Sequence, residues 1–173
     1  GNHGGDMYLG NRKFLKDSLE VANQYIIIAN SDEKAANALE GLGLYNQASY
    51  FYIQAMEKQI KANIAQIVDV TNTYYRDLIR NTMGHSLDKS LDLLIKIYAK
   101  GDAVVAEQLK NQLLTLVLKG VRFTALHNNI RYPNFYEIKK KYSMIEINKS
   151  DCDELSKMLS NLKNYLNEMK NRF

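Results

Sequence analysis

Apolar residues recur at helical spacings along most of the chain, and the row between residues 45 and 70 is the most regular. Its positions lie three or four residues apart, which places them on one face of an α-helix. This row consists of Ile53, Met56, Ile60, Ile64 and Ile67. Gln54, Lys58 and Lys61 fall on the other side, and Glu57 with Lys61 has the spacing of an i,i+4 ion pair. The pattern predicts a helix over 45–70.

Five further segments carry helical stripes of apolar residues. They span residues 11–30, 32–42, 87–99, 103–128 and 151–170. The first stripe consists of Leu15, Leu19, Ala22, Ile26 and Ala29. Segment 103–128 is apolar over most of its circumference, so we expect it to be the central helix of the bundle. Asp151 with Glu154 resembles a capping arrangement at the start of the last helix.

Two helix boundaries stay open in the sequence. Ser31 and Asp32 either cap a new helix or lie inside one helix that runs through both segments. The helix of 45–70 either ends near residue 70 or extends through Tyr74, Tyr75 and Leu78. The end of the 32–42 segment is better defined, because Gly41 and Gly43 favour termination of a helix.

Short connections make consecutive helices antiparallel neighbours, so the sequence predicts an all-α, up-and-down bundle of five or six helices. Its only proline, Pro133, marks an irregular connection before the last helix. The predicted core consists of Ile53, Met56, Ile60, Ile64, Leu113, Leu116, Val117, Leu159, Leu162 and Leu166.

Composition narrows the functional classes. The 173 residues fit one domain, and the net charge of +4 permits contact with a polyanion without requiring it. The single cysteine, Cys152, excludes an intramolecular disulfide and a cysteine-based metal site, and we expect it to be structural. No apolar run approaches the length of a membrane span, and no secretory signal is visible, so we expect a cytoplasmic protein without membrane contact. No phosphate loop or metal-ligand pattern is visible, so we expect no cofactor and no metal.

Arg80, Asn81 and His85 form the strongest candidate site. Arginine carries a fixed charge and a planar set of donors that matches a phosphate. Histidine exchanges protons near neutral pH, and the asparagine amide can orient a hydroxyl or a phosphate oxygen. Together these side chains suit chemistry on a phosphodiester.

The spacing alone is not specific. Arg122 and His127 repeat it in an apolar helical run, where we interpret it as chance. A purely structural interpretation of the first copy also exists. In it, Gly84 ends a helix, His85 lies near the last carbonyl groups, and Arg80 pairs with an acidic neighbour.

Four segments, in order, resemble the prokaryotic HEPN domain family. Residues 45–62 contain Gln54-Ala-Met-Glu-Lys-Gln-Ile-Lys-Ala62, which is similar to the core of the second helix of the family. Residues 80–85 resemble its Arg-polar-x-x-x-His signature, and residues 85–89 resemble the His-x-Leu-x-Lys continuation. Arg131-Tyr-Pro133 resembles a loop before the last helix. The resemblance covers about residues 32–170.

The resemblance implies a bundle that dimerises around the Arg80–His85 segment. Many relatives are metal-independent ribonucleases, often toxins or stress effectors, with a composite site across a homodimer. Others are non-catalytic partners of small, antitoxin-like nucleotidyltransferases, or bind nucleotides or RNA. Some relatives are silenced by nucleotide transfer onto a tyrosine two residues after the histidine. Leu87 occupies that position here, which argues against this mode of silencing.

The predicted organisation follows from the stripes and the resemblance together. Residues 1–10 are predicted to be a disordered terminus with the composition of a tag remnant. Residues 11–31 are predicted to be an additional N-terminal helix, and 32–173 a HEPN-like helical domain. Whether the protein is an enzyme depends on dimer geometry. One chain offers a single histidine for the chemistry, so the general acid has to come from a second copy.

Overall fold

The computed structural model describes residues 15–82, 87–118, 134–136, 141–143 and 146–172, and within them the chain is mostly helical. The α-helices are α1 (Leu15–Gly41), α2 (Tyr45–Ile67), α3 (Thr73–Asp77), α4 (Leu87–Ala99), α5 (Ala103–Gln112) and α7 (Lys149–Arg172). Two π-helical segments continue α3 and α5, namely η2 (Leu78–Thr82) and η3 (Leu113–Leu118). The prediction of a helical protein is therefore confirmed.

A short β-hairpin is the main addition to the predicted architecture. Strands β1 (Asn134–Tyr136) and β2 (Lys141–Ser143) pair antiparallel, with Phe135 opposite Tyr142. The aromatic residues are of types that favour strands. Three residues are too few for a strand to show an alternating pattern, so the hairpin could not be predicted from periodicity.

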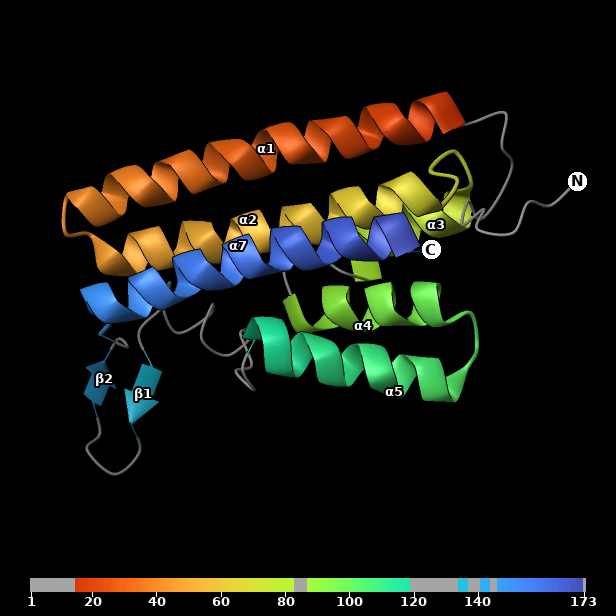
Figure 1. Cartoon of the computed structure of the whole chain (residues 1–173). Coiled ribbons are helices and arrows are strands. Elements are labelled where there is room, and N and C mark those ends of the chain that lie inside the picture. Colours follow the sequence, from red (N-terminus) through yellow and green to blue (C-terminus); the bar gives the residue numbers. More distant parts are fainter. Residues whose placement is uncertain (1–14, 83–86, 119–133, 137–140, 144–145, 173) are drawn as a thin grey trace, which may run out of the picture.

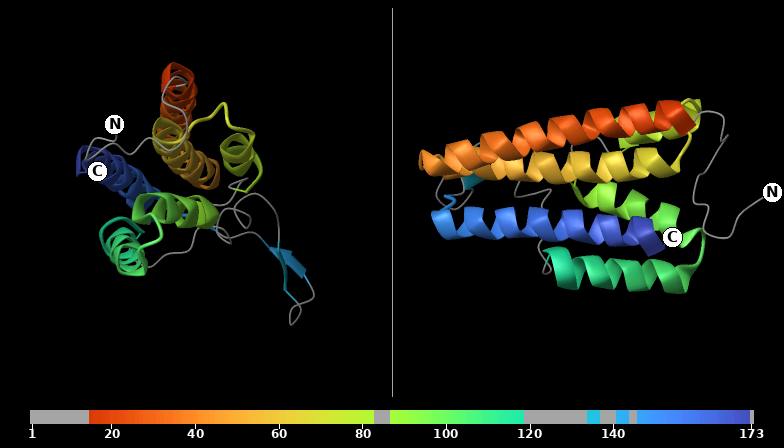
Figure 2. Two further views of the ribbon diagram at one scale, coloured as in Figure 1. Left: turned by 90° about the vertical axis from the view of Figure 1, so that its right-hand side faces the viewer. Right: turned by 45° about the horizontal axis from the view of Figure 1, so that its top comes forward.

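Helix α2 occupies the centre of the bundle. Figures 1 and 2 show α1, α7 and α4 packed around it, with α5 lying beyond α4. Fifteen of the 23 residues of α2 are buried, whereas α5 buries only Leu109. The expectation that segment 103–128 is central was wrong as far as the structure describes that segment, because its apolar residues face outward as well as inward. Residues 119–128 lie outside the described part.

Helix α1 runs without interruption through residues 31 and 32. Asp32 pairs with Lys58 of α2 at 2.7 Å, and Glu33 pairs with Lys163 of α7, also at 2.7 Å. The acidic side chains thus join α1 to its neighbours rather than capping a new helix. The boundary predicted between 31 and 32 falls inside this helix, and the division into an added helix and a HEPN-like domain stays a prediction.

The chain breaks after α2, and Ser18 of α1 holds the break. Val68 adopts an extended conformation, and the buried hydroxyl of Ser18 donates to its carbonyl oxygen at 2.9 Å. Asn72 then caps α3 by accepting a hydrogen bond from the backbone N–H of Tyr74 at 2.9 Å. A side-chain cap of this kind competes with continuation of the preceding helix. Residues 74–78 therefore belong to a new helix and not to an extension of α2.

Nine of the ten predicted core residues are buried. The exception is Leu116, which is 58% exposed. In η3 the chain is π-helical, so residues four and five apart share a face, and Leu113, Val117 and Leu118 turn inward. Position 116, three residues after Leu113, rotates outward. Leu19 of α1 was also predicted to face the core and is 48% exposed, because the buried row of α1 runs through Ser18 and Ala22.

The start of α7 is capped one turn earlier than predicted. Asn148 accepts a hydrogen bond from the N–H of Asp151 at 2.9 Å, and its own N–H donates to Asp151 Oδ2 at 3.1 Å. These two bonds form a capping box at Asn148. The expected arrangement of Asp151 with Glu154 was wrong by three positions.

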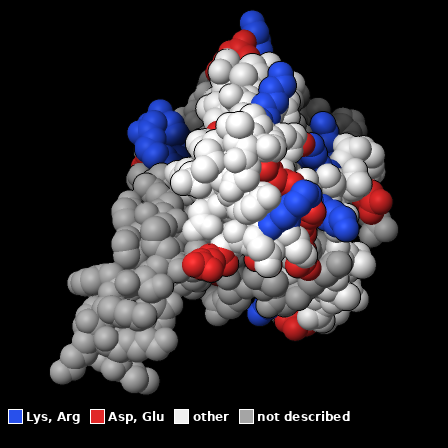
Figure 3. All heavy atoms as spheres, turned by 90° about the vertical axis from the view of Figure 1, so that its left-hand side faces the viewer, with Lys and Arg blue, Asp and Glu red and all other residues white. Residues whose placement is uncertain are grey.

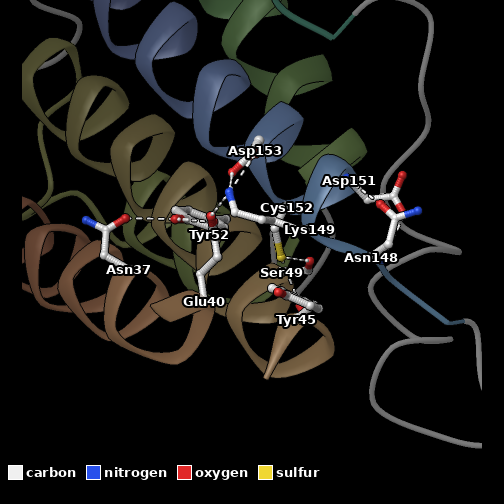
Figure 4. Close-up of polar contacts among 10 residues, drawn as sticks. All are labelled: Asn37, Glu40, Tyr45, Ser49, Tyr52, Asn148, Lys149, Asp151, Cys152 and Asp153. Atoms are coloured by element: carbon white, nitrogen blue, oxygen red, sulfur yellow. Dashed lines mark hydrogen bonds and ion pairs between the residues drawn. The ribbon is translucent and has the colours of Figure 1, made fainter. Parts of the chain in front are cut away.

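A polar cluster joins this end of α7 to the turn between α1 and α2 (Figure 4). The thiol of Cys152 is buried and lies 3.1 Å from Ser49 Oγ and 3.2 Å from the carbonyl oxygen of Tyr45. Nearby, the hydroxyl of Tyr52 lies 2.7 Å from Asn37 Oδ1. Burial raises the pKa of the Cys152 thiol. A protonated, enclosed thiol is a poor nucleophile, which agrees with a structural cysteine.

Among the described residues, no helix is long and apolar enough to cross a membrane.

Candidate functional site

The Arg80–His85 segment begins on the outside of the bundle, in η2. The side chain of Ile79 is buried, and the next side chain, Arg80, is exposed. Asn81 follows in the same π-helical turn, and His85 lies outside the described residues. The structure thus brings Arg80 and Asn81 into one turn and leaves the position of His85 undescribed.

The path of the backbone explains how Arg80 comes to the surface. The N–H of Leu78 donates to the carbonyl oxygens of both Tyr74 and Tyr75 where α3 ends, and the π-helical segment η2 begins at the same residue. Such π-helical turns occur frequently at functional sites. Ile79 anchors the turn in the core, and this anchor directs its neighbour Arg80 away from the core.

The charge of Arg80 acts on the hydroxyl group of Tyr25 in α1. The ring of Tyr25 is half-buried, and burial raises the pKa of its hydroxyl, while the positive charge of Arg80 acts in the opposite direction. In the part of the chain that the structure describes, no carboxylate forms an ion pair with Arg80. This finding weakens the structural interpretation, in which Arg80 serves an acidic neighbour.

Glu57, which has the sequence spacing of an ion pair with Lys61, is a buried acid. Glu57 is 1% exposed, and among the described residues its Oε1 atom has no hydrogen-bond partner. Burial raises the pKa of the Glu57 carboxyl group to about 7, although the charges of Lys61 and Lys58 act to lower it. A signal was present in the sequence, since Glu57 lies four residues after Ile53 and three before Ile60, within the apolar row itself.

Other candidate chemistry is sparse in the described residues. No group of three or more His, Cys, Asp or Glu side chains there is arranged to hold a metal ion. The second copy of the spacing, Arg122 with His127, and the Arg131-Tyr-Pro133 segment lie outside the described residues. The comparison of the two copies therefore stays a prediction.

At the opposite end of the bundle, the described residues form no basic surface that would compete for a polyanion (Figure 3). Figure 3 shows the end that holds the turn between α1 and α2, where positive and negative side chains are interspersed around uncharged surface. Leu42 and Leu44 in that turn are exposed. Charges of mixed sign do not form the continuous basic surface that nucleic acids favour.

No family model matches the chain, and no curated protein or solved structure matches it. The resemblance to the HEPN family consequently rests on the four sequence segments alone.

Proposed function

We propose that this chain is a HEPN-like endoribonuclease that needs no metal ion and works as a homodimer. The observation that carries the proposal is the exposed position of Arg80 on a π-helical turn, without a carboxylate partner among the described residues. An arginine presented in this way is available to a phosphate. Asn81 lies in the same turn, which supports a shared role for the two residues.

The proposed reaction needs one base, one acid and one positive charge. His85 removes the proton from the ribose 2′-hydroxyl, whose oxygen attacks the adjacent phosphorus atom. Arg80 stabilises the negative charge that develops on the phosphoryl oxygens, and Asn81 orients the attacking hydroxyl. The P–O5′ bond breaks, and the departing oxygen takes a proton from a general acid. The products are a 2′,3′-cyclic phosphate and a free 5′-hydroxyl.

The general acid is assigned to a second copy of the chain. A twofold dimer around residues 76–88 supplies His85 from each subunit to one composite site. Such an interface is expected to bury at least about 1,200 Å² in total. Light scattering at micromolar concentration should then report about twice the chain mass of 19.9 kDa. A strictly monomeric protein would contradict the composite site.

The activity test is cleavage of end-labelled RNA in EDTA, followed by analysis of the product ends. We expect wild type to release 2′,3′-cyclic phosphates, and His85→Ala to lose about 10²–10⁴-fold in rate. Arg122→Ala and His127→Ala share the spacing and serve as controls that should retain activity. Circular dichroism checks that each variant is folded. Equal rates for wild type and His85→Ala would remove the catalytic assignment.

One outcome leads to the second candidate function. If wild type binds RNA or a nucleotide but does not cleave, the chain is better described as a non-catalytic HEPN-like module. Its partner would then be a small nucleotidyltransferase, and co-purification with such a protein would identify the system.

A further inference from the structure

A groove runs between the end of α3 and the length of α4, and neither the sequence nor the comparisons assigned a role to it. Its volume is about 710 Å³, within the range of ligand-binding clefts. Tyr74, Tyr75 and Leu78 form one wall, and α4 forms the other. Figure 2 shows α3 and α4 on neighbouring sides of α2.

The first wall presents aromatic surface. The rings of Tyr74 and Tyr75 lie 5.2 Å apart in an edge-to-face arrangement, and Tyr74 is 60% exposed. In this geometry the two rings do not cover each other face to face. An exposed tyrosine face can stack on any nucleic-acid base, because every base has a π-face.

The second wall presents positive charge to the groove. Lys96 and Lys100 line it and are exposed, with Lys96 in the last turn of α4 and Lys100 directly after the end of that helix. Lys89 lines the groove two turns earlier, and Asp92 is the acidic residue of the lining. The lining is therefore net positive, which suits phosphate groups.

Leu93 and Ile97 lie between the lysines and face the same groove. An apolar surface flanked by ammonium groups and a tyrosine does not suit inorganic phosphate, which would leave this surface uncovered. It suits a ligand that combines flat, uncharged rings with phosphates. A duplex keeps its bases stacked inside, where Tyr74 has no access to their faces, so the ligand has to be single-stranded.

The groove leads to the candidate catalytic segment. Leu78 is both a lining residue and the first residue of η2, two positions before Arg80. On the other wall, Lys89 lies four positions after His85. We infer that the groove between α3 and α4 binds single-stranded RNA, with a base stacked on Tyr74 and phosphates on Lys96 and Lys100. The choice of RNA as the nucleic acid rests on the proposed function.

The test is fluorescence anisotropy with a labelled RNA of about ten unpaired nucleotides, on the full chain carrying His85→Ala. Adding Tyr74→Ala should weaken binding about 5- to 150-fold, whereas Tyr74→Phe keeps the ring and should bind like the parent. Adding Lys96→Gln with Lys100→Gln should weaken binding and reduce the slope of log K against log salt by about 1.4, for two lost phosphate contacts. Lys34→Gln with Lys110→Gln, two exposed lysines on α1 and α5, is the matched control and should change neither.

The other possible outcomes distinguish failure of the groove assignment from failure of the proposed nuclease activity. Unchanged binding in the Tyr74→Ala and lysine variants, or the same affinity for a duplex, would overturn the groove assignment. Displacement of the RNA by AMP at much lower concentration than by the unlabelled RNA would make a free nucleotide the occupant and overturn it as well. If the wild type never cleaves RNA, but the groove variants still weaken RNA binding, the groove assignment stands and the proposed nuclease activity is contradicted. If the wild type cleaves RNA and the groove variants cleave it equally well, the proposed nuclease activity stands and the groove assignment is contradicted.

Discussion

Two regions of the molecule differ in how many side chains they bury. One is the contact between α7 and α2, and the other is the arm formed by α3 and η2, residues 73–82. Where α7 meets α2, apolar rows interlock and buried polar groups are satisfied. Asn63 donates to the carbonyl oxygen of Leu166 at 3.4 Å and accepts from the hydroxyl of Tyr98 at 2.7 Å. In the arm, α3 buries no side chain, and Ile79 is its one buried residue among those with a described side chain.

This difference indicates that the contact between α2 and α7 stabilises the fold, whereas the arm carries the candidate chemistry. Segments with few buried contacts open at low free-energy cost, and binding and catalytic elements are commonly drawn from them. Arg80 and Tyr74 are both exposed on the arm, while α2 and α7 contain most of the buried residues in the described part of the chain. Substitutions on the arm should therefore change activity and spare folding, and substitutions between α2 and α7 should do the reverse.

The largest expected effect is the loss of activity in Arg80→Ala. Removing the charge that faces the developing phosphorane should lower RNA cleavage at least as much as His85→Ala does, by about 10²–10⁴-fold. Because Arg80 is exposed, the free energy of unfolding should change by about 0.5 kcal/mol or less. The measurements are cleavage rates in EDTA and urea unfolding of the same samples.

Arg76→Ala is the matched control for that variant. Arg76 is exposed on the same arm, one helical turn before Arg80, and lies outside the predicted signature. Because Arg76 lies at the edge of the proposed interface of residues 76–88, light scattering first checks that the variant is still a dimer. The dimeric variant should cleave RNA at close to the wild-type rate. Equal losses in the two variants would mean that general positive charge on the arm matters, and that Arg80 has no specific role.

The second prediction compares two leucines that the sequence placed in the same core. Leu162 of α7 is fully buried, and Leu162→Ala should lower the free energy of unfolding by about 2–5 kcal/mol. Leu116 of η3 is 58% exposed, and Leu116→Ala should cost about 0.5 kcal/mol or less. Urea unfolding gives both values. A large loss for Leu116→Ala would restore the predicted core and contradict the π-helical turn.

These two leucines show which parts of the fold the sequence could predict. The rows of α2, α4 and α7 have regular spacing, so their buried residues follow from a period of 3.6. The π-helical turns change that period, and no residue type in Leu113–Leu118 predicts the change. The break after α2 depends on Ser18, which is 50 residues away from Val68 in sequence. Contacts between distant residues cannot be read from a local pattern.

The candidate site was predictable in part for a related reason. Residue types and spacing suggested Arg80, Asn81 and His85, and the exposure of Arg80 fits that suggestion. The groove beside them depends on how α3 lies against α4, which the sequence left open. The burial of Glu57 was missed because only its spacing to Lys61 was considered, although its position in the apolar row indicated burial.

The third prediction uses the buried carboxyl group of Glu57. Its pKa in the folded protein, about 7, lies above the ordinary value of 4.5. Between these values the folded state binds more protons than the unfolded state, so the free energy of unfolding falls as pH rises from about 4.5 to about 7. Glu57→Gln removes this charge and should be more stable than wild type at pH 8 by about 1–2 kcal/mol, with a smaller difference at pH 5.

Urea unfolding at the two pH values measures this difference. Glu107→Gln on α5 is the control, because Glu107 is exposed and should show no such dependence on pH. Lys61 and Lys58 carry the charges that act on Glu57 and remain in both proteins. The opposite result would be a Glu57→Gln variant that is less stable than wild type at pH 8 but not at pH 5. It would mean that the charged carboxylate stabilises the fold, and would contradict the prediction that its burial is unfavourable.

The smallest expected effect tests the cap of α7, where this helix joins the polar cluster at the turn between α1 and α2. Asn148→Ala removes the side chain that accepts the N–H of Asp151, and should lower the free energy of unfolding by about 1 kcal/mol. Glu154→Ala tests the cap that the sequence predicted. Because Glu154 is exposed, its loss should cost about 0.5 kcal/mol or less, mainly through the helix dipole. Thermal and urea unfolding of both variants give the comparison, and a larger loss for Glu154→Ala than for Asn148→Ala would move the helix start to the position expected from the sequence.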